Sequence, residues 1–187
     1  MKNKINLTFL QSMIVMPLMA MSIAQATPGS ATILTDANVQ NQEPVLSEAD
    51  LRERAEIAAK IDQYYTDHDM PLAGYGAKMV EVAYENDLDP YLIPALSVRE
   101  STGGKFACKT RANNPFGWAS CKVGFETMDI AIEKIGQHLS GNHPKTSSYY
   151  KNKDVKGILQ TYNPPSVVPA YASQVMSIMT KIKNTEA

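Results

Sequence analysis

One carboxylic acid, Glu100, has the sequence surroundings that acid catalysis requires. It follows Ile93 and Leu96 at the i, i+3, i+7 spacing that places side chains on one face of a helix, and this apolar face should be buried. The pattern stops at Gly103 and Gly104, so Glu100 lies in the last helical turn, where the helix dipole disfavours negative charge. Burial and a helix C-terminus both raise the pKa of a carboxyl group. The general acid of glycoside cleavage needs such a raised pKa.

Nearby cations act in the opposite direction. Glu100 is the only acid between positions 99 and 122, where the cations are Arg99, Lys105, Lys109, Arg111 and Lys122. Close cations would lower the pKa of Glu100, whereas cations that point to solvent would leave burial dominant. The same basic rim would attract an anionic polymer, unless it is an ordinary solvated loop. The structural alternative for Glu100 is a surface glutamate at a frayed helix end, paired with Arg99.

Aromatic residues form a second candidate group. Phe116 and Trp118 lie in the segment 113–118, which reads NNPFGW, and Tyr162 and Tyr171 flank a proline-rich turn. Sugar rings stack on aromatic faces, and asparagine side chains offer a donor and an acceptor to acetamido groups. Substrate binding is therefore predicted for Phe116 and Trp118. The alternative is that both form a small core of their own loop, and that Tyr171 belongs to the main core.

The two cysteines, Cys108 and Cys121, indicate a disulfide. It would close a loop of about a dozen residues and stabilise the fold by roughly 2–3 kcal/mol in the chain-entropy model. The alternative is a zinc site, but the three histidines (His68, His138 and His143) show no ligand spacing relative to the cysteines. We therefore expect neither a metal nor another cofactor.

The first 26 residues are typical of a secretory signal peptide. Lys2 and Lys4 precede an apolar run, and residues 24–26 (AQA) fit a small-x-small cleavage site. A retained membrane anchor is the alternative, but Pro17 interrupts the run. Residues 27–46 are predicted to be a flexible linker. We expect a protein exported to the periplasm, cell wall or exterior, without stable membrane insertion after cleavage.

The net charge argues against nucleic-acid binding. The formal net charge of the chain is −1, and it becomes more negative when the leader, which contains Lys2 and Lys4 but no acid, is removed. General nucleic-acid binding calls for a basic domain.

Periodicity and capping signals predict helices over 47–68, 75–84, 91–102, 127–140, 154–160 and 169–182. The inward stripe of the first helix is predicted from Leu51, Ala55, Ala58 and Tyr65. The last helix is predicted to begin at Pro169, with Tyr171, Val175, Ile178 and Ile182 inward. Residues 103–125 are expected to form a long loop with a short hairpin, and 141–153 to form turns. Residues 47–187 are therefore predicted as one small, mainly α domain with a disulfide-stapled active-site loop.

Three motifs resemble those of the lysozyme-like superfamily. Residues 95–101 (ALSVRES) resemble the Glu-Ser motif of soluble-lytic-type lytic transglycosylases. Residues 113–117 (NNPFG), followed by Phe125, resemble the Asn-x-Phe-Gly segment of bacterial cell-wall glucosaminidases of the flagellar and autolysin type. Residues 162–165 (YNPP) and 169–172 (PAYA) are similar to the tyrosine-rich segment before the final helix of that family. The resemblance extends from residue 73 to residue 182.

This resemblance implies a lysozyme-like fold that acts on the glycan strands of peptidoglycan. It implies that Glu100 is the general acid and that Tyr162 or Tyr171 assists near the reacting sugar. It also implies that three further residues shape the cleft, namely Ser101, Asn114 and Phe116.

The sequence departs from the family pattern in two places. The segment between the Phe-Gly motif and the next helix is very short, although glucosaminidases can carry a second carboxylate there, and the Gly-Leu-Met-Gln segment of typical transglycosylases is missing. A mechanism with one acid, completed by the substrate's own acetamido or hydroxyl group, therefore fits better than a two-carboxylate mechanism. We expect a monomeric glycosidase that cleaves between N-acetylglucosamine and N-acetylmuramic acid. The alternatives are a non-catalytic glycan-binding or assembly module on the same fold, and a structural helical domain without a groove.

Overall fold

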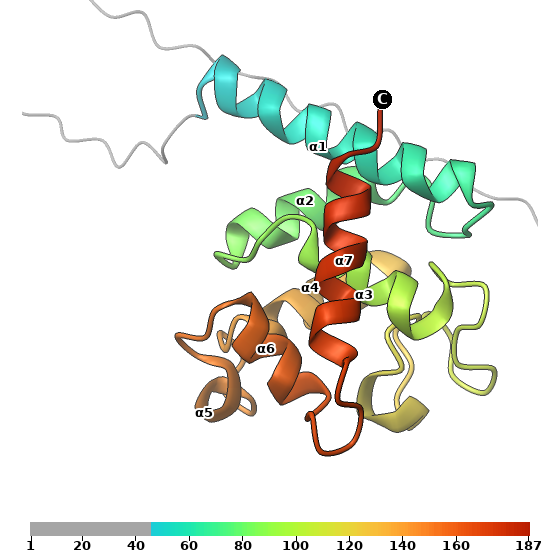
Figure 1. The fold of residues 1–187 in the computed structure, drawn as a ribbon, viewed down its shortest axis with the longest axis vertical. Coiled ribbons are helices and arrows are strands. Elements are labelled where there is room, and N and C mark those ends of the chain that lie inside the picture. Colours follow the sequence, from blue (N-terminus) through green and yellow to red (C-terminus); the bar gives the residue numbers. More distant parts are fainter. Residues whose placement is uncertain (1–45) are drawn as a thin grey trace, which may run out of the picture. The chain divides into compact units, whose positions relative to one another are not determined.

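The computed structural model describes residues 46–187, and every helix longer than a single turn in this part of the chain is an α-helix. No strand occurs among the described residues, which confirms the mainly α class. The elements in chain order are α1 (Glu48–Asp67), α2 (Gly76–Glu85), α3 (Leu92–Ser101), the 3-10 turn η1 (Trp118–Cys121), α4 (Met128–Leu139), α5 (Ser147–Tyr150), α6 (Val155–Tyr162) and α7 (Tyr171–Lys183) (Figure 1).

The leader predicted at 1–26 and nearly all of the linker predicted at 27–46 lie outside the described residues. Within residues 46–187, no helix combines the length and apolar character needed to cross a membrane.

Helix α3 is the central element of the domain. It packs against α2, α4 and α7, and α7 runs beside it through the middle of the domain (Figure 1). Its buried residues cover every side of the helix: Leu92, Ile93, Pro94, Ala95, Leu96, Ser97 and Ser101. A helix that is buried all round must be enclosed by its neighbours. Only its last turn approaches the surface, and this turn carries Glu100.

The two ends of α3 follow from its sequence. Pro94 occupies the first turn, where a backbone N–H has no helical partner in any case, so the proline does not disturb the helix. Asp89 accepts a hydrogen bond from the backbone N–H of Tyr91 at 2.9 Å and so fixes the entry into the helix. At the other end Thr102 adopts a left-handed conformation with φ 54°, and the N–H of Gly103 bonds to the carbonyl of Ser97 at 3.1 Å.

Side-chain caps set the starts of three other helices. Ser47 and Asp50 form a capping box at the start of α1. Thr127 caps α4 by accepting from the N–H of Ile130 at 3.2 Å. Asp154 caps α6 by accepting from the N–H of Gly157 at 2.7 Å.

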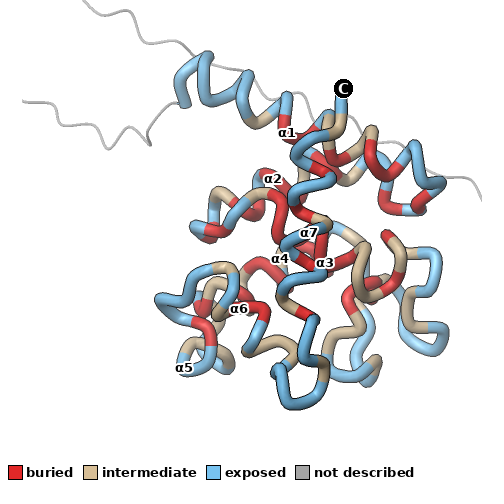
Figure 2. The backbone as a smooth tube through the Cα atoms, in the orientation of Figure 1, coloured by how far each residue is buried: buried red, intermediate tan, exposed pale blue. Residues whose placement is uncertain are grey.

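Several expected details are wrong. Leu51 and Ala55 are exposed because the N-terminal half of α1 extends beyond the packed part of the domain (Figure 2). Helix α7 begins at Tyr171 rather than at Pro169, and Met179 is buried on its inner side where Ile178 is only half-buried. The turns expected over 141–153 contain the short helix α5, and η1 replaces the expected hairpin in the loop 103–125.

Gly136 of α4 contacts Val82 of α2 closely and should not tolerate a side chain. A Cβ atom on Gly136 would lie 2.3 Å from Cγ1 of Val82, a fully buried and stiff side chain. Alanine adds about 1 kcal/mol of helix propensity, but overpacking costs about 1–3 kcal/mol. Since a contact this short puts the overpacking cost in the upper part of that range, we expect Gly136→Ala to lower the free energy of unfolding by about 1–2 kcal/mol after the propensity gain, measured by urea unfolding. Val82→Ala in the same chain should make the combined loss smaller than the sum of the two single losses. A Gly136→Ala protein as stable as the wild type would contradict this account.

Candidate functional site

Glu100 and Tyr171 form the centre of the site. Tyr171 is the first residue of α7 and is 1% exposed, and its hydroxyl donates a hydrogen bond to Oε1 of Glu100. Glu100 is half-buried at the end of α3. Burial raises the pKa of Glu100, and this effect exceeds the opposing effects of the Tyr171 hydrogen bond and of the nearby Arg99 charge.

The cations around Glu100 point elsewhere. The guanidinium carbon of Arg99 lies 5.4 Å from the centre of the Tyr171 ring, and its Nε donates to Gln174 at 3.0 Å. Lys105 donates to the carbonyl of His68, and the Nε of Arg111 donates to the carbonyl of Lys122. Within residues 46–187 no ion pair involves Glu100. This geometry favours burial as the dominant influence and speaks against a frayed, Arg-paired surface glutamate.

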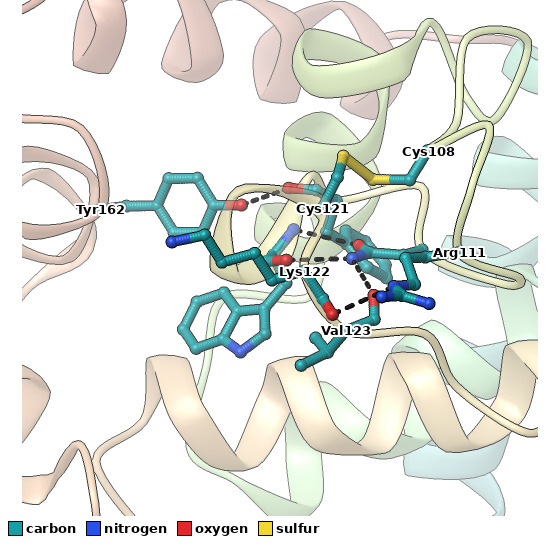
Figure 3. The surroundings of a disulfide bond; sticks show 9 residues. Cys108, Arg111, Cys121, Lys122, Val123 and Tyr162 are labelled. Carbon is teal, nitrogen blue, oxygen red and sulfur yellow. Dashed lines mark hydrogen bonds between the residues drawn. A yellow bond between two sulfur atoms is a disulfide. The ribbon is translucent and has the colours of Figure 1, made fainter.

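Tyr162 connects the site to the loop 103–125. Its hydroxyl donates to the carbonyl oxygen of Phe116, and Figure 3 shows its side chain pointing at the disulfide loop. The rings of Tyr162 and Tyr171 are stacked, with centroids 6.0 Å apart. Burial raises the pKa of both phenols, with further contributions from Glu100. Both hydroxyl groups therefore stay protonated at neutral pH and serve as hydrogen-bond donors.

The disulfide predicted between Cys108 and Cys121 is present, with Cα atoms 5.6 Å apart (Figure 3). It uses both cysteines, which removes them as zinc ligands. Among the described residues no three His, Cys, Asp or Glu side chains lie together as a metal site.

Asn114 is the second device that closes this loop. Its side-chain amide donates to the carbonyl oxygens of Trp118 and Val123, both at 3.0 Å, and its Oδ1 accepts from the N–H of Trp118 at 3.0 Å. The side chain is fully buried and has its donors and acceptor occupied. Asn114 therefore sets the shape of the loop.

The loop between Asn114 and the disulfide has an unusual backbone. Ala119, Ser120 and Cys121 are successive residues with φ of 53–57°, the left-handed region. Such a conformation costs about 1–2 kcal/mol per residue that is not glycine. Gly117, with φ 61°, permits a close approach to the acid, because a Cβ atom there would lie 3.3 Å from Oε2 of Glu100. The disulfide and the Asn114 bonds hold this strained turn beside Glu100.

A groove of about 520 Å³ lies over these residues, within the size range of small-ligand sites. Its lining residues are Glu100, Gly117, Trp118, Ala119, Ser120, Tyr150, Tyr162, Asn163, Pro164 and Val167. Glu100 is the only carboxylic acid among them. The groove thus combines one acid with an indole ring and two phenols.

Trp118 lines this groove and is held in place by His138. Its ring stacks on His138 at a centroid distance of 4.7 Å, and His138 in turn lies 4.1 Å from His143. Nδ1 of His138 is 3.1 Å from the hydroxyl of Thr146. Burial lowers the pKa of His138 to about 4, so the ring is neutral at physiological pH. Sequence spacing shows only that His138 lies near the end of the helix predicted over 127–140, because its stacking on Trp118 depends on contacts between α4 and the loop 103–125.

The predicted site residues fall into two groups. Glu100, Trp118 and Tyr162 line the groove, and Tyr171 lies behind Glu100. Ser101, Asn114 and Phe116 are buried beneath the groove and do not line it. The hydroxyl of Ser101 is occupied by the backbone of Ser97 and Gly104, and Phe116 is fully enclosed in the core. These three side chains are therefore placed to support the groove rather than to contact a sugar.

Two lining residues whose side chains have no hydrogen-bond partner within residues 46–187 were not identified from the sequence, namely Tyr150 and Asn163. Both depend on the position of α5 and of the turn after α6. Periodicity does not mark an element as short as α5.

No protein-family model matches this sequence, and no curated protein sequence matches it. The lysozyme-like resemblance therefore stays a prediction from the three motifs.

Asn114 offers a test of how the loop is held. In Asn114→Asp, the two hydrogen bonds that the side-chain amide donates to the carbonyls of Trp118 and Val123 are lost. A carboxylate oxygen then faces these carbonyl oxygens and repels them. We expect a loss of about 2–4 kcal/mol in the free energy of unfolding. Trp118 is the only tryptophan, so the fluorescence of the protein should also shift to longer wavelength as the loop loosens and the indole ring becomes more exposed to water. Asn184→Asp, the same change at an exposed position, is the control. Unchanged stability and emission in Asn114→Asp would contradict the role of Asn114 in holding the loop.

The raised pKa of Glu100 leads to a pH-dependent effect on stability. A carboxyl group with a native-state pKa above its unfolded-state pKa stabilises the fold at low pH, and this contribution is lost as the pH rises through the native-state pKa. Glutamine cannot ionise. Relative to wild type, Glu100→Gln should therefore become more stable as the pH rises from about 4 to 7. Thermal unfolding across this range measures the trend, and Glu85→Gln makes the same change at the exposed end of α2. A difference in stability between wild type and Glu100→Gln that stays constant with pH would contradict the raised pKa of Glu100.

Proposed function

We propose that this protein is an exported peptidoglycan glycosidase that cleaves the glycan strand between N-acetylglucosamine and N-acetylmuramic acid, with Glu100 as the general acid. The observation that supports this most directly is the single half-buried carboxylic acid in an aromatic-lined groove, with its pKa raised by burial. Cleavage of a glycosidic bond needs a carboxylic acid that is still protonated when it meets the leaving oxygen.

The two oxygens of Glu100 have different surroundings. Oε1 accepts from the hydroxyl of Tyr171, whereas Oε2 is the nearer oxygen to Gly117 at the groove. In the proposed reaction the proton is carried on Oε2 and passes to the glycosidic oxygen as the bond to C1 breaks. The Tyr171 hydrogen bond then stabilises the carboxylate that remains.

Trp118 and Tyr162 supply surfaces suited to a sugar. Their ring centroids are 5.8 Å apart, and both side chains line the groove that contains Glu100. A pyranose ring can stack on an aromatic face, and the stacked His138 keeps that face in place. The proposed partner is accordingly a glycan strand of peptidoglycan, bound by a monomer.

The groove offers no second carboxylate from the described residues, so the substrate itself is proposed to complete the reaction. In one route the acetamido oxygen attacks C1 and water then releases a reducing N-acetylglucosamine end. In the other route the C6 hydroxyl of N-acetylmuramic acid attacks C1, gives its proton to the Glu100 carboxylate and leaves an anhydro end. Export is part of the proposal, and the Cys108–Cys121 disulfide supports it because disulfides persist in oxidising compartments.

The proposed function can be tested by digestion of purified peptidoglycan sacculi. Wild-type protein should release soluble muropeptides, and Glu100→Gln should reduce the rate at least about 100-fold with its fold intact. Glu85→Gln, remote from the groove, should keep the wild-type rate. Mass spectrometry of the products distinguishes anhydro ends from reducing N-acetylglucosamine ends. Wild-type activity in Glu100→Gln would overturn the proposal, and a protein that binds sacculi without releasing fragments would be a glycan-binding module instead.

A further inference from the structure

Tyr150 is a polar group of the groove for which the reaction above has no role. It is the last residue of α5, is 7% exposed, and lines the groove with Glu100 and Tyr162. Within residues 46–187 its hydroxyl has no hydrogen-bond partner. The only side-chain nitrogen or oxygen of these residues that is both enclosed and unpartnered is Nε of Arg54, so the Tyr150 hydroxyl is not enclosed. An almost completely buried tyrosine that lines the groove therefore carries an accessible hydroxyl with no hydrogen-bond partner among the described residues.

The position of Tyr150 is fixed by α4. Its backbone N–H donates to the carbonyl of Thr146 at 3.1 Å, and the hydroxyl of Thr146 lies 3.2 Å from the carbonyl oxygen of His138. The next residue, Lys151, packs against Gly141, where a Cβ atom would lie 2.5 Å from the Lys151 nitrogen. Tyr150 and Trp118 are thus anchored to the same end of α4, through His138. This rigid support is what a specific contact requires.

The chemistry of this hydroxyl is that of a donor. Burial raises the pKa of Tyr150 to about 12, so the phenol keeps its proton at neutral pH. Because Tyr150 is only 7% exposed, it offers a small contact area, which suits a small substituent rather than a whole sugar ring. The acetamido carbonyl of an N-acetyl sugar is a compact acceptor of this kind. A binding site with an accessible donor favours a ligand that carries the matching acceptor, by about the free energy of one hydrogen bond.

We propose that Tyr150 determines specificity by donating a hydrogen bond from its hydroxyl to the acetamido carbonyl oxygen of an N-acetylated sugar in the groove. This inference rests on the proposed function, because it assumes that the groove binds amino-sugar strands. It adds a residue that reads the acetyl group, separate from Glu100 and from the aromatic stacking surface.

The fluorescence of Trp118, the only tryptophan, measures binding without any need for turnover. Wild-type, Tyr150→Phe and Tyr149→Phe proteins are titrated with tri-N-acetylchitotriose and with the same trisaccharide after removal of its acetyl groups. Tyr150→Phe should bind the acetylated ligand about fivefold more weakly, as expected for one lost hydrogen bond. Its affinity for the deacetylated ligand should match that of the wild type. Tyr149→Phe removes a hydroxyl from an adjacent side chain that is 62% exposed and should leave both affinities unchanged.

The outcomes separate the two proposals. Tyr150→Phe that binds the acetylated ligand like the wild type, or that weakens both ligands equally, overturns the role of Tyr150 while the glycosidase proposal stands. Wild-type protein that binds neither trisaccharide and releases nothing from sacculi overturns both. Thermal unfolding of Tyr150→Phe verifies that any loss of affinity occurs in a folded domain.

Discussion

The hydrogen bond from Tyr171 to Glu100 is the contact on which the architecture of the site depends. It joins the first residue of α7 to the last turn of α3, the helix that the rest of the domain encloses. Glu100 is half-buried because α3 must be covered by α2, α4 and α7, and the same packing brings Tyr171 against it. The burial of apolar side chains around α3 offsets the desolvation cost of the Glu100 carboxyl group. The packing that stabilises the fold therefore also positions the acid.

The loop 103–125 is a second constraint, and it works by different means. Besides the buried ring of Phe116, two devices hold this long loop, namely the Cys108–Cys121 disulfide and the side-chain hydrogen bonds of Asn114. These two devices make it possible to keep three successive left-handed residues beside Glu100. Strained backbone of this kind persists where the surroundings over-determine it, and that is most common at functional sites.

Much of the fold could be predicted from the sequence, whereas only part of the site could. Capping residues such as Ser47 and Thr127, and the apolar spacing before Glu100, are local signals, and the helices they predicted are present. The direction in which a loop side chain points depends on contacts with distant parts of the chain, which neighbouring residues do not reveal. Asn114 has the chemistry of a sugar ligand, yet its donors and acceptor are used by the loop's own backbone. Tyr150 could not be predicted as a groove residue for the same reason, because the residues adjacent to it in sequence do not indicate that α5 contributes to the groove.

The balance at Glu100 explains how one carboxyl group can serve in both halves of the proposed reaction. Burial favours the protonated form, which must be present when the glycosidic oxygen arrives, while the Tyr171 donor and the Arg99 charge favour the ionised form that follows. Since both influences act on the same group, the acid can give up its proton and later take one back from the attacking hydroxyl or water. A second carboxylate is then unnecessary, which agrees with a groove that contains one acid among the described residues.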